Sequence, residues 1–242
     1  MKTYWNNKNV PESDPDSNRR RFLKNGLFYG TLAGIAGMSS FTGCSKKAEE
    51  EISPAEDLMR EHGVLNRILL IYDTCKLNLI NGKEFPTDVL HNSATIISDF
   101  IEGYHEKLEE DILFPRFLKQ NYLAELIQVL SIQHSAGRKL TGQIIQLTKS
   151  NTLSDPDESK KLIQLLDGFN TMYRPHEARE DTVLFPAIRK IIPENEYFEM
   201  GEDFESKEHE LFGDEGFESI VGKVADLEKQ LGIYELSEFT PQ

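Results

Sequence analysis

Two eleven-residue stretches of the sequence, HEKLEEDILFP at residues 105–115 and HEAREDTVLFP at residues 176–186, follow one pattern. Each has His-Glu, two residues, Glu, a second acid, two residues and then Leu-Phe-Pro. A His and a Glu four residues apart lie about one turn apart on the same face of an α-helix. The repeat therefore predicts two equivalent helical turns, each of which presents an imidazole and a carboxylate side by side.

The sequence around the repeats has the periodicity of α-helices from residue 53 onward, and strand signals are scarce. Apolar residues recur at steps of three and four in four long segments, which cover residues 53–82, 87–115, 122–149 and 155–187. Four long amphipathic helices with short connections favour an all-α fold, an up-down-up-down four-helix bundle. The tail from Pro193 to Leu231 predicts additional C-terminal helices.

Composition and periodicity together divide the chain into four parts. We expect a leader, a linker, the bundle and a C-terminal helical extension at residues 1–44, 45–53, 54–190 and 191–242. The chain has 41 Asp and Glu residues against 27 Lys and Arg residues, which gives a net charge of −14. Because this field repels phosphate, it argues against nucleic acid and anionic lipid surfaces as partners.

The leader has a basic segment, NRRRFLKNG at residues 18–26, and then about 15 uncharged, Gly-rich, moderately apolar residues. This apolar run is shorter than the roughly 20 residues that a membrane-spanning helix needs. It ends at a small-residue site, FTGC at residues 41–44. These features predict a processed export signal.

The leader resembles a twin-arginine signal peptide, in which Arg19 and Arg20 form the arginine pair and Asn18 replaces the usual Ser or Thr. The FTGC stretch resembles a lipobox, with Phe41 in place of the usual Leu and Cys44 as the lipidated residue. The resemblance implies export of a folded protein to the periplasm or cell envelope, with a lipid anchor as its membrane contact. Cleavage without lipidation is the alternative.

Cysteine usage agrees with this interpretation. The chain has two cysteines, so lipidation of Cys44 leaves Cys75 without a disulfide partner. Cys75 lies within a helical pattern, where we expect a small buried hydrophobic residue.

Six polar residues lie on the apolar faces of the four predicted helices: His62, His105, Glu109, His134, His176 and Glu180. Burying a carboxylate costs several kcal/mol unless it is paired or bound to a metal, and these faces carry no neighbouring Lys or Arg. The two single histidines precede the repeat histidines by 43 and 42 residues. Two helical hairpins related by a two-fold axis would therefore bring the six groups together as a two-metal site. A metal-free bundle with ordinary core histidines is the alternative.

The ligand types indicate which metal such a site would prefer. The absence of thiolates on these faces excludes soft-metal sites and Fe–S clusters. Imidazole and carboxylate at two centres suit iron first, manganese second and zinc third. Two histidines per metal and two bridging glutamates supply four ligands to each ion, and a bridging oxide or hydroxide supplies a fifth. An octahedral iron then keeps one open position for O₂ or another small ligand.

Residues 54–190 resemble the hemerythrin-like HHE cation-binding family, because both repeats and both single histidines fit its pattern. The resemblance implies that the six residues bind two iron ions and that both glutamates bridge. The sequence departs from oxygen-carrying hemerythrins at Arg138, where those proteins have a further His, and this departure argues against long-lived O₂ carriage. Asp181 has the spacing of the Asp in those carriers, but we prefer Glu180 because it repeats the geometry of Glu109.

The leading hypothesis is a non-haem di-iron protein that binds, senses or scavenges O₂, nitric oxide or peroxide outside the cytoplasm. A di-iron peroxidase or oxidase is the enzymatic alternative, and iron storage or delivery is a third. No residue pattern identifies a redox partner.

Other polar residues carry weaker signals. Glu102 and His105 form one Glu-x-x-His element of the ferritin-like type, but Tyr173 stands where the second element needs its Glu. His91 lies about 21 Å along the helix from His105, too far to share a site. We expect His209 at the surface or against the C-terminal tail.

Overall fold

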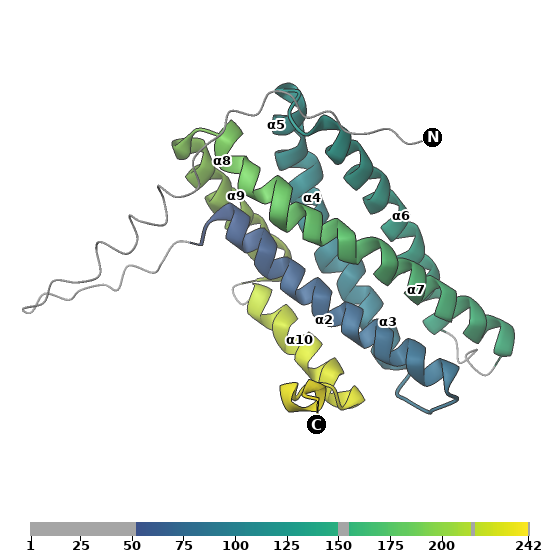
Figure 1. The fold of residues 1–242 in the computed structure, drawn as a ribbon. Helices are drawn as coiled ribbons and strands as arrows, with labels where there is room; N and C mark the ends of the chain where they lie inside the picture. The colour runs from purple at the N-terminus through teal and green to yellow at the C-terminus, as the bar shows by residue number, and fades with distance from the viewer. Residues whose placement is uncertain (1–51, 150–154, 214–215, 242) are drawn as a thin grey trace, which may run out of the picture. The chain divides into compact units, whose positions relative to one another are not determined.

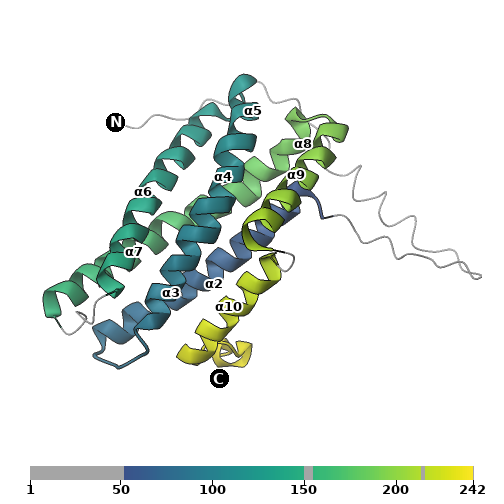
Figure 2. The same cartoon turned by 180° about the vertical axis from the view of Figure 1, so that it is seen from behind.

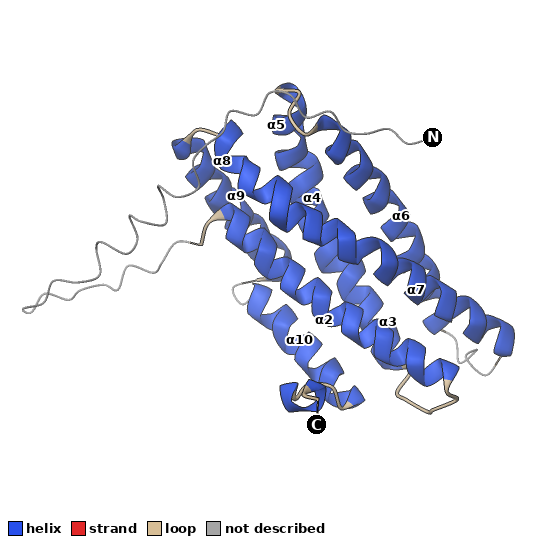
Figure 3. Ribbon diagram, in the orientation of Figure 1, coloured by secondary structure: helices blue, strands red, loops and turns tan. Residues whose placement is uncertain are grey.

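The computed structural model describes residues 52–149, 155–213 and 216–241. These residues form helices and loops without any strand (Figures 1 and 3), which confirms the predicted all-α class. The predicted leader and Cys44 lie outside the described residues. Among the helices that are described, none is both long and apolar enough to cross a membrane.

Four long helical rods form the bundle (Figures 1 and 2). The first and third rods are single helices, α2 (Pro54–Ile80) and α6 (Ala124–Thr148). The second rod comprises α3 (Asp88–Ile96), η1 (Ile97–His105), α4 (Glu106–Leu108), η2 (Glu109–Leu113) and α5 (Phe114–Lys119). The fourth rod comprises α7 (Pro156–Arg179), η4 (Glu180–Leu184), η5 (Phe185–Ala187) and α8 (Ile188–Ile191). Each rod packs against the rods before and after it, and α7 also packs against α2, which closes the bundle.

Local sequence signals explain where the first and fourth rods begin. The Ser53 hydroxyl accepts a hydrogen bond from the Glu56 amide at 3.4 Å, and Pro54 follows as the first helical residue. The Asp155 carboxylate accepts from the Asp157 amide at 2.9 Å in the same way. These N-caps satisfy amides that a helix start leaves without intrahelical partners.

Both copies of the repeated stretch depart from the α-helix at the same place. The π-helical segments η2 and η4 each begin at the Glu of the repeat. In each, the amide of the repeat Phe donates to the carbonyl of that Glu, five residues earlier. Single π turns inside α-helices are rare and occur frequently at functional sites.

The prolines that close the two repeats do not end the rods. From its chemistry, a proline inside a helix is expected to kink or end it, and here the helical type changes at both sites while the second rod continues to Lys119 and the fourth to Ile191. A proline lacks the amide that an α-helix interior requires. The preceding π turn changes the hydrogen-bond register at this point, so the proline stands at the start of a new helical segment.

The C-terminal extension packs along the bundle. Helices α9 (Glu194–Phe212) and α10 (Gly216–Leu231) lie against α2 and the second rod, and a short 3-10 helix, η6 (Leu236–Phe239), follows (Figure 2). Tyr104 donates to the Phe204 carbonyl at 3.3 Å, and the Phe100 and Phe212 rings pack with centroids 5.4 Å apart. The extension therefore covers the face of the second rod that lies next to His105.

Candidate metal centre

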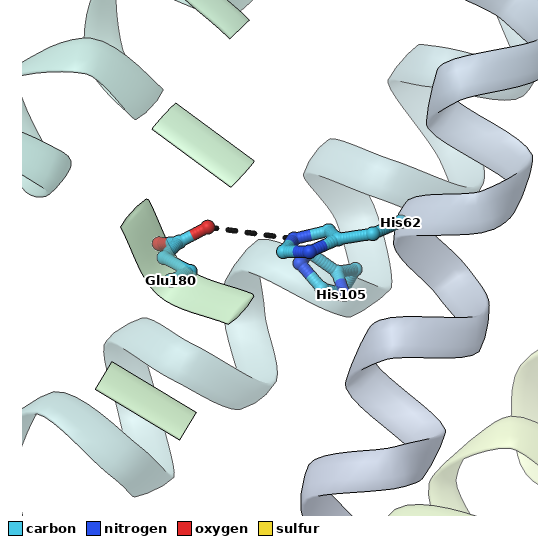
Figure 4. A group of neighbouring side chains, drawn as sticks. All are labelled: His62, His105 and Glu180. Atoms are coloured by element: carbon cyan, nitrogen blue, oxygen red, sulfur yellow. Dashed lines mark ion pairs between the residues drawn. The ribbon is translucent and has the colours of Figure 1, made fainter. Parts of the chain in front are cut away.

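The six polar residues predicted on the apolar faces meet inside the bundle, and all six are buried: His62, His105, Glu109, His134, His176 and Glu180. The first histidine pair (His62 and His105) lies near Glu180, and each of the three offers a ligand atom within 4.8 Å of the others (Figure 4). The second histidine pair (His134 and His176) forms a matching group with the same Glu180.

Each glutamate stands between the two pairs. Glu180 Oε2 lies 3.4 Å from His62 Nε2 and 3.1 Å from His176 Nε2. Glu109 Oε2 lies 3.8 Å from His105 Nε2 and 3.4 Å from His134 Nε2. Both carboxylates therefore reach one histidine of each pair, as a residue that bridges two neighbouring ions must.

The centre contains polar atoms without partners. Both oxygens of Glu109 and both oxygens of Glu180 are buried and make no hydrogen bond. His134 Nε2 and His176 Nε2 also face each other at 3.2 Å. Buried carboxylates are costly unless a cation or hydrogen bonds compensate them. The donor set therefore fits a bound cation.

The outer nitrogen of every histidine has an acceptor. The bonds from Nδ1 are His62 to Asp181 at 2.8 Å, His105 to Glu61 at 2.5 Å, His134 to Glu110 at 3.1 Å and His176 to Gln133 at 2.9 Å. A hydrogen bond at Nδ1 places the proton there and leaves the Nε2 lone pair free. With a cation bound, all four Nε2 lone pairs can thus face the centre, as metal ligation requires.

Residues 53–188 match the hemerythrin HHE cation binding domain. This chain belongs to the hemerythrin HHE family. Proteins of Mycobacterium bovis and of two strains of Mycobacterium tuberculosis, each named as uncharacterized, are 42% identical to it over 222 residues. These alignments cover 87% of this chain and 87% of each relative, so the likeness extends beyond the family match. No solved structure matches significantly.

The residues that accept the Nδ1 hydrogen bonds also repeat between the two halves of the hemerythrin domain. The first half comprises the first and second rods, and the second half comprises the third and fourth. Each acceptor is the chain neighbour of one central residue and bonds a histidine on another rod. Glu61 precedes His62 in the first half, and Gln133 precedes His134 in the second. From the sequence, Asp181 was considered only as an alternative ligand. The roles of Glu61, Glu110 and Gln133 as acceptors were not predicted. Their position beside predicted ligands is the signal that was overlooked.

Burial and neighbouring charges set the protonation of the histidines in the metal-free hemerythrin domain. Burial lowers the pKa of His62, but the hydrogen bond to Asp181 and the nearby carboxylate of Glu180 outweigh it and raise the pKa to about 10. For His134, burial is likewise outweighed by its carboxylate partners, and the pKa rises to about 10. Burial lowers the pKa of His105 to about 4. In the metal-free site the raised pKa values of His62 and His134 favour their protonated forms at neutral pH.

The two glutamates titrate in opposite directions. Burial, with the charge of Glu180, raises the pKa of Glu109. Burial also acts to raise the pKa of Glu180, but the imidazoles of His176 and His62 outweigh it and lower the pKa. A buried acid pair of this kind resists carrying two charges, and bound cations would remove that resistance.

The Leu-Phe-Pro part of each repeat walls the centre with an aromatic ring. Phe185 stacks on His62 with ring centroids 5.3 Å apart, and Phe114 stacks on His134 at 5.6 Å. Each Phe thus covers the single histidine of the other half of the domain. This arrangement keeps water from the sides of the two imidazoles.

Arg138, at the position of the additional His in oxygen carriers, is turned toward two acids. Its guanidinium donates to Glu106 at 2.5 Å and to Glu110 at 2.6 Å. Tyr173 donates to the other oxygen of Glu106 at 2.7 Å. Tyr173 fits because Gly137 has no side chain, since a Cβ there would lie 2.0 Å from the Tyr173 hydroxyl. Arg138, Glu106 and Tyr173 form what we call the arginine network, beside the second histidine pair.

Several other residues named from the sequence lie outside the group of six central residues. His91 pairs with the Thr148 hydroxyl at 3.2 Å, and His209 is exposed on α9. Glu102 is buried, and burial raises its pKa to about 7. Cys75 is fully buried, as predicted, and burial raises the pKa of its thiol to about 12.

Proposed function

We propose that this chain is a non-haem di-iron protein that binds O₂ or a related small ligand, nitric oxide or peroxide. Binding, sensing or scavenging of that ligand is its proposed role. The observation that carries the proposal is the set of unpartnered buried oxygens of Glu109 and Glu180, placed between four inward-facing Nε2 atoms. Such a group is costly without cations and favourable with them.

In this proposal the first histidine pair would hold one iron and the second pair the other, with Glu109 and Glu180 as the carboxylate ligands that both pairs can share. The outer acceptors keep each Nε2 lone pair directed at the centre, and the stacked phenylalanines hold water away. Iron supplies redox chemistry and an open coordination position for the small ligand. Manganese is the second candidate, because it accepts the same oxygen and nitrogen donors.

An enzymatic role, as a peroxidase or oxidase, is the second candidate function, and the arginine network favours it. Tyr173 and Glu106 are buried, whereas the side chain of Arg138 is 34% exposed. Tyr173 and Glu106 thus form a short route along which a proton can move beside the second histidine pair, while the Arg138 guanidinium, which stays protonated, lies between this route and solvent. A turnover reaction needs such a route for protons, whereas simple ligand binding does not.

We also propose export by the twin-arginine route and a lipid anchor at Cys44, which place the protein in the periplasm or cell envelope. The leader pattern and the lipobox support this proposal. Cys44→Ser should move the full-length protein from the membrane fraction to the soluble fraction of expressing cells. Equal membrane retention of the variant would contradict the lipid anchor.

The main experiment uses purified chain whose iron has been measured. We expect about two irons per chain from the ligand count. The protein is reduced without air, O₂ is admitted, and the visible absorption is followed before and after evacuation. A change that reverses supports ligand binding, and steady consumption of peroxide faster than by free iron supports the enzyme. Isolated protein that holds neither iron nor manganese and takes up neither metal would rule out both.

A further inference from the structure

A second cluster of acids lies beside the metal centre, where α2 meets α9. Asp57 and Glu61 are one turn apart on α2, and Glu208 comes from the C-terminal extension. Each of the three offers a carboxylate oxygen within 4.8 Å of the other two. The central residues of the hemerythrin domain do not contribute to this group.

Glu61 connects the cluster with the centre. Its side chain is fully buried, and its Oε2 pairs with His105 Nδ1 at 2.5 Å. Its Oε1 is buried as well and has no hydrogen-bond partner. One carboxylate oxygen of Glu61 thus orients a histidine of the centre, and the same side chain also offers a ligand oxygen to the group with Asp57 and Glu208.

The position of Glu208 is fixed by the start of α10. Its Oε1 accepts a hydrogen bond from the Phe217 amide at 2.8 Å. A Cβ at Gly216 would lie 2.5 Å from that oxygen, so the glycine permits this close approach. Glu208 is therefore held toward α2 by the backbone of its own extension.

The nearby arginine does not enter the cluster. Arg60 Nη1 lies 3.8 Å from Asp57 Oδ1, at the edge of an ion pair. Its Nη2 pairs instead with Glu218 at 3.4 Å, and its guanidinium lies 4.3 Å above the Phe217 ring. Three carboxylates thus lie close together, one of them with a buried oxygen that makes no hydrogen bond, and Arg60 comes within ion-pair distance of Asp57 alone among them, so like-charge repulsion opposes the arrangement.

We propose that Asp57, Glu61 and Glu208 bind a hard divalent cation, of the class of Ca²⁺, Mg²⁺ and Mn²⁺, at a site separate from the di-iron centre. An all-oxygen donor set with no imidazole or thiolate selects this class. The cation joins α9 to α2 and stabilises the docking of the C-terminal extension. Through Glu61 it also holds the carboxylate that orients His105.

Calorimetric titration of the full chain, with the central site first loaded with iron, tests the proposal with Ca²⁺ and separately with Mn²⁺. We expect at least one of these cations to bind at one additional site per chain. Glu208→Gln should weaken that binding by about tenfold or more, because the number of charged ligands tunes affinity. The Gln amide oxygen can still accept from the Phe217 amide, so the start of α10 keeps its hydrogen bond.

Glu202→Gln is the matched control, because Glu202 is an exposed acid on the same helix. Its affinity for the cation should equal that of the wild type. Wild-type protein that binds neither cation, or Glu208→Gln protein that binds as the wild type does, would overturn the proposal. Thermal unfolding adds a second measurement: the binding cation should raise the Tm of the wild type and of Glu202→Gln more than that of Glu208→Gln.

Iron content of the same samples separates this site from the proposed di-iron function. Wild type and Glu208→Gln should contain equal iron, because Glu208 does not touch the six central residues. If the wild type takes up no iron, the di-iron proposal fails. The difference in Ca²⁺ or Mn²⁺ binding between wild type and Glu208→Gln still tests the acidic site in that case.

Discussion

The first and second histidine pairs repeat one geometry but have unequal charges around them. The outer acceptors of the first pair are both carboxylates, Asp181 and Glu61. The second pair has one carboxylate, Glu110, which Arg138 pairs at 2.6 Å, and one neutral amide, Gln133. A carboxylate acceptor makes an imidazole a stronger metal ligand than an amide does.

Because of these unequal charges, the two halves of the domain need not have the same role. The repeated residues place equivalent nitrogens and oxygens around the centre, whereas their chain neighbours set the charge. The first pair should therefore hold the more strongly bound metal. The second pair, with the arginine network beside it, should be the one where a small ligand and a proton are exchanged.

Removing one histidine of the second pair should have the largest effect. His134→Ala deletes one of the two nitrogens of that pair, so bound metal should fall to one ion per chain or none. His91→Ala changes a histidine of the second rod that bonds only Thr148 among the described contacts, and its metal content should stay at the wild-type level. Metal analysis of the two purified variants checks this, and equal losses in both would contradict the proposed ligand set.

The arginine network beside the second pair can be disturbed at Gly137, which lies against Tyr173. Gly137→Ala places a methyl group 2.0 Å from the Tyr173 hydroxyl and should displace it from Glu106. Such overpacking typically costs about 1–3 kcal/mol of unfolding free energy. Urea denaturation measures this loss.

Gly142→Ala, also on α6, is the control for that substitution. A Cβ at Gly142 meets nothing within 4 Å, so Ala there should raise stability by up to about 1 kcal/mol through helix propensity. If the two alanines change stability alike, the close contact between Gly137 and Tyr173 does not exist in solution.

The sequence predicted most of the fold because its signals were local. Caps at Ser53 and Asp155 marked helix starts, and the apolar periodicity carried through each rod. The π turns in the two repeats were not predictable, because they change the hydrogen-bond pattern without a distinct residue preference. For the same reason Pro115 and Pro186 were expected to kink or end their helices. The rods continue past both prolines.

The central residues were predictable because polar residues on an apolar face are anomalous, and six of them recurred in register. The outer acceptors carried no such anomaly. Glu61 and Gln133 lie one position away from central histidines, on a neighbouring part of the helix surface where a polar residue is ordinary. Only the packing of one rod against another turns these side chains toward His105 and His176.

Changing the charge of either one of two outer acceptors should make the pairs more alike. Asp181→Asn keeps an oxygen that can accept from His62 but removes its charge. Loss of such an outer partner typically lowers metal affinity by about 10–100-fold, and we expect the lower end because the hydrogen bond survives. Gln133→Glu should act in the opposite direction at the second pair. Competition with a chelator measures both affinities, and an identical change in the two variants would refute the asymmetry.

The pH dependence of stability should produce the smallest effect, and it concerns one histidine of each pair. In the metal-free chain the pKa of His62 and of His134 is about 10, above the ordinary value of 6.5. A raised folded-state pKa adds stability that is complete below 6.5 and is lost as pH rises toward 10. The Tm of the metal-free chain should therefore fall as pH rises over this interval.

Iron binding removes the cause of that trend, because a ligating nitrogen cannot keep its proton. The iron-loaded chain should show no such fall, and its formation at neutral pH should release protons from His62 and His134. Thermal unfolding of both forms across the pH interval, with calorimetry in buffers of different ionisation enthalpy, measures the two quantities. Parallel Tm curves for the two forms, without proton release on loading, would show that iron does not bind these two histidines, one from each pair.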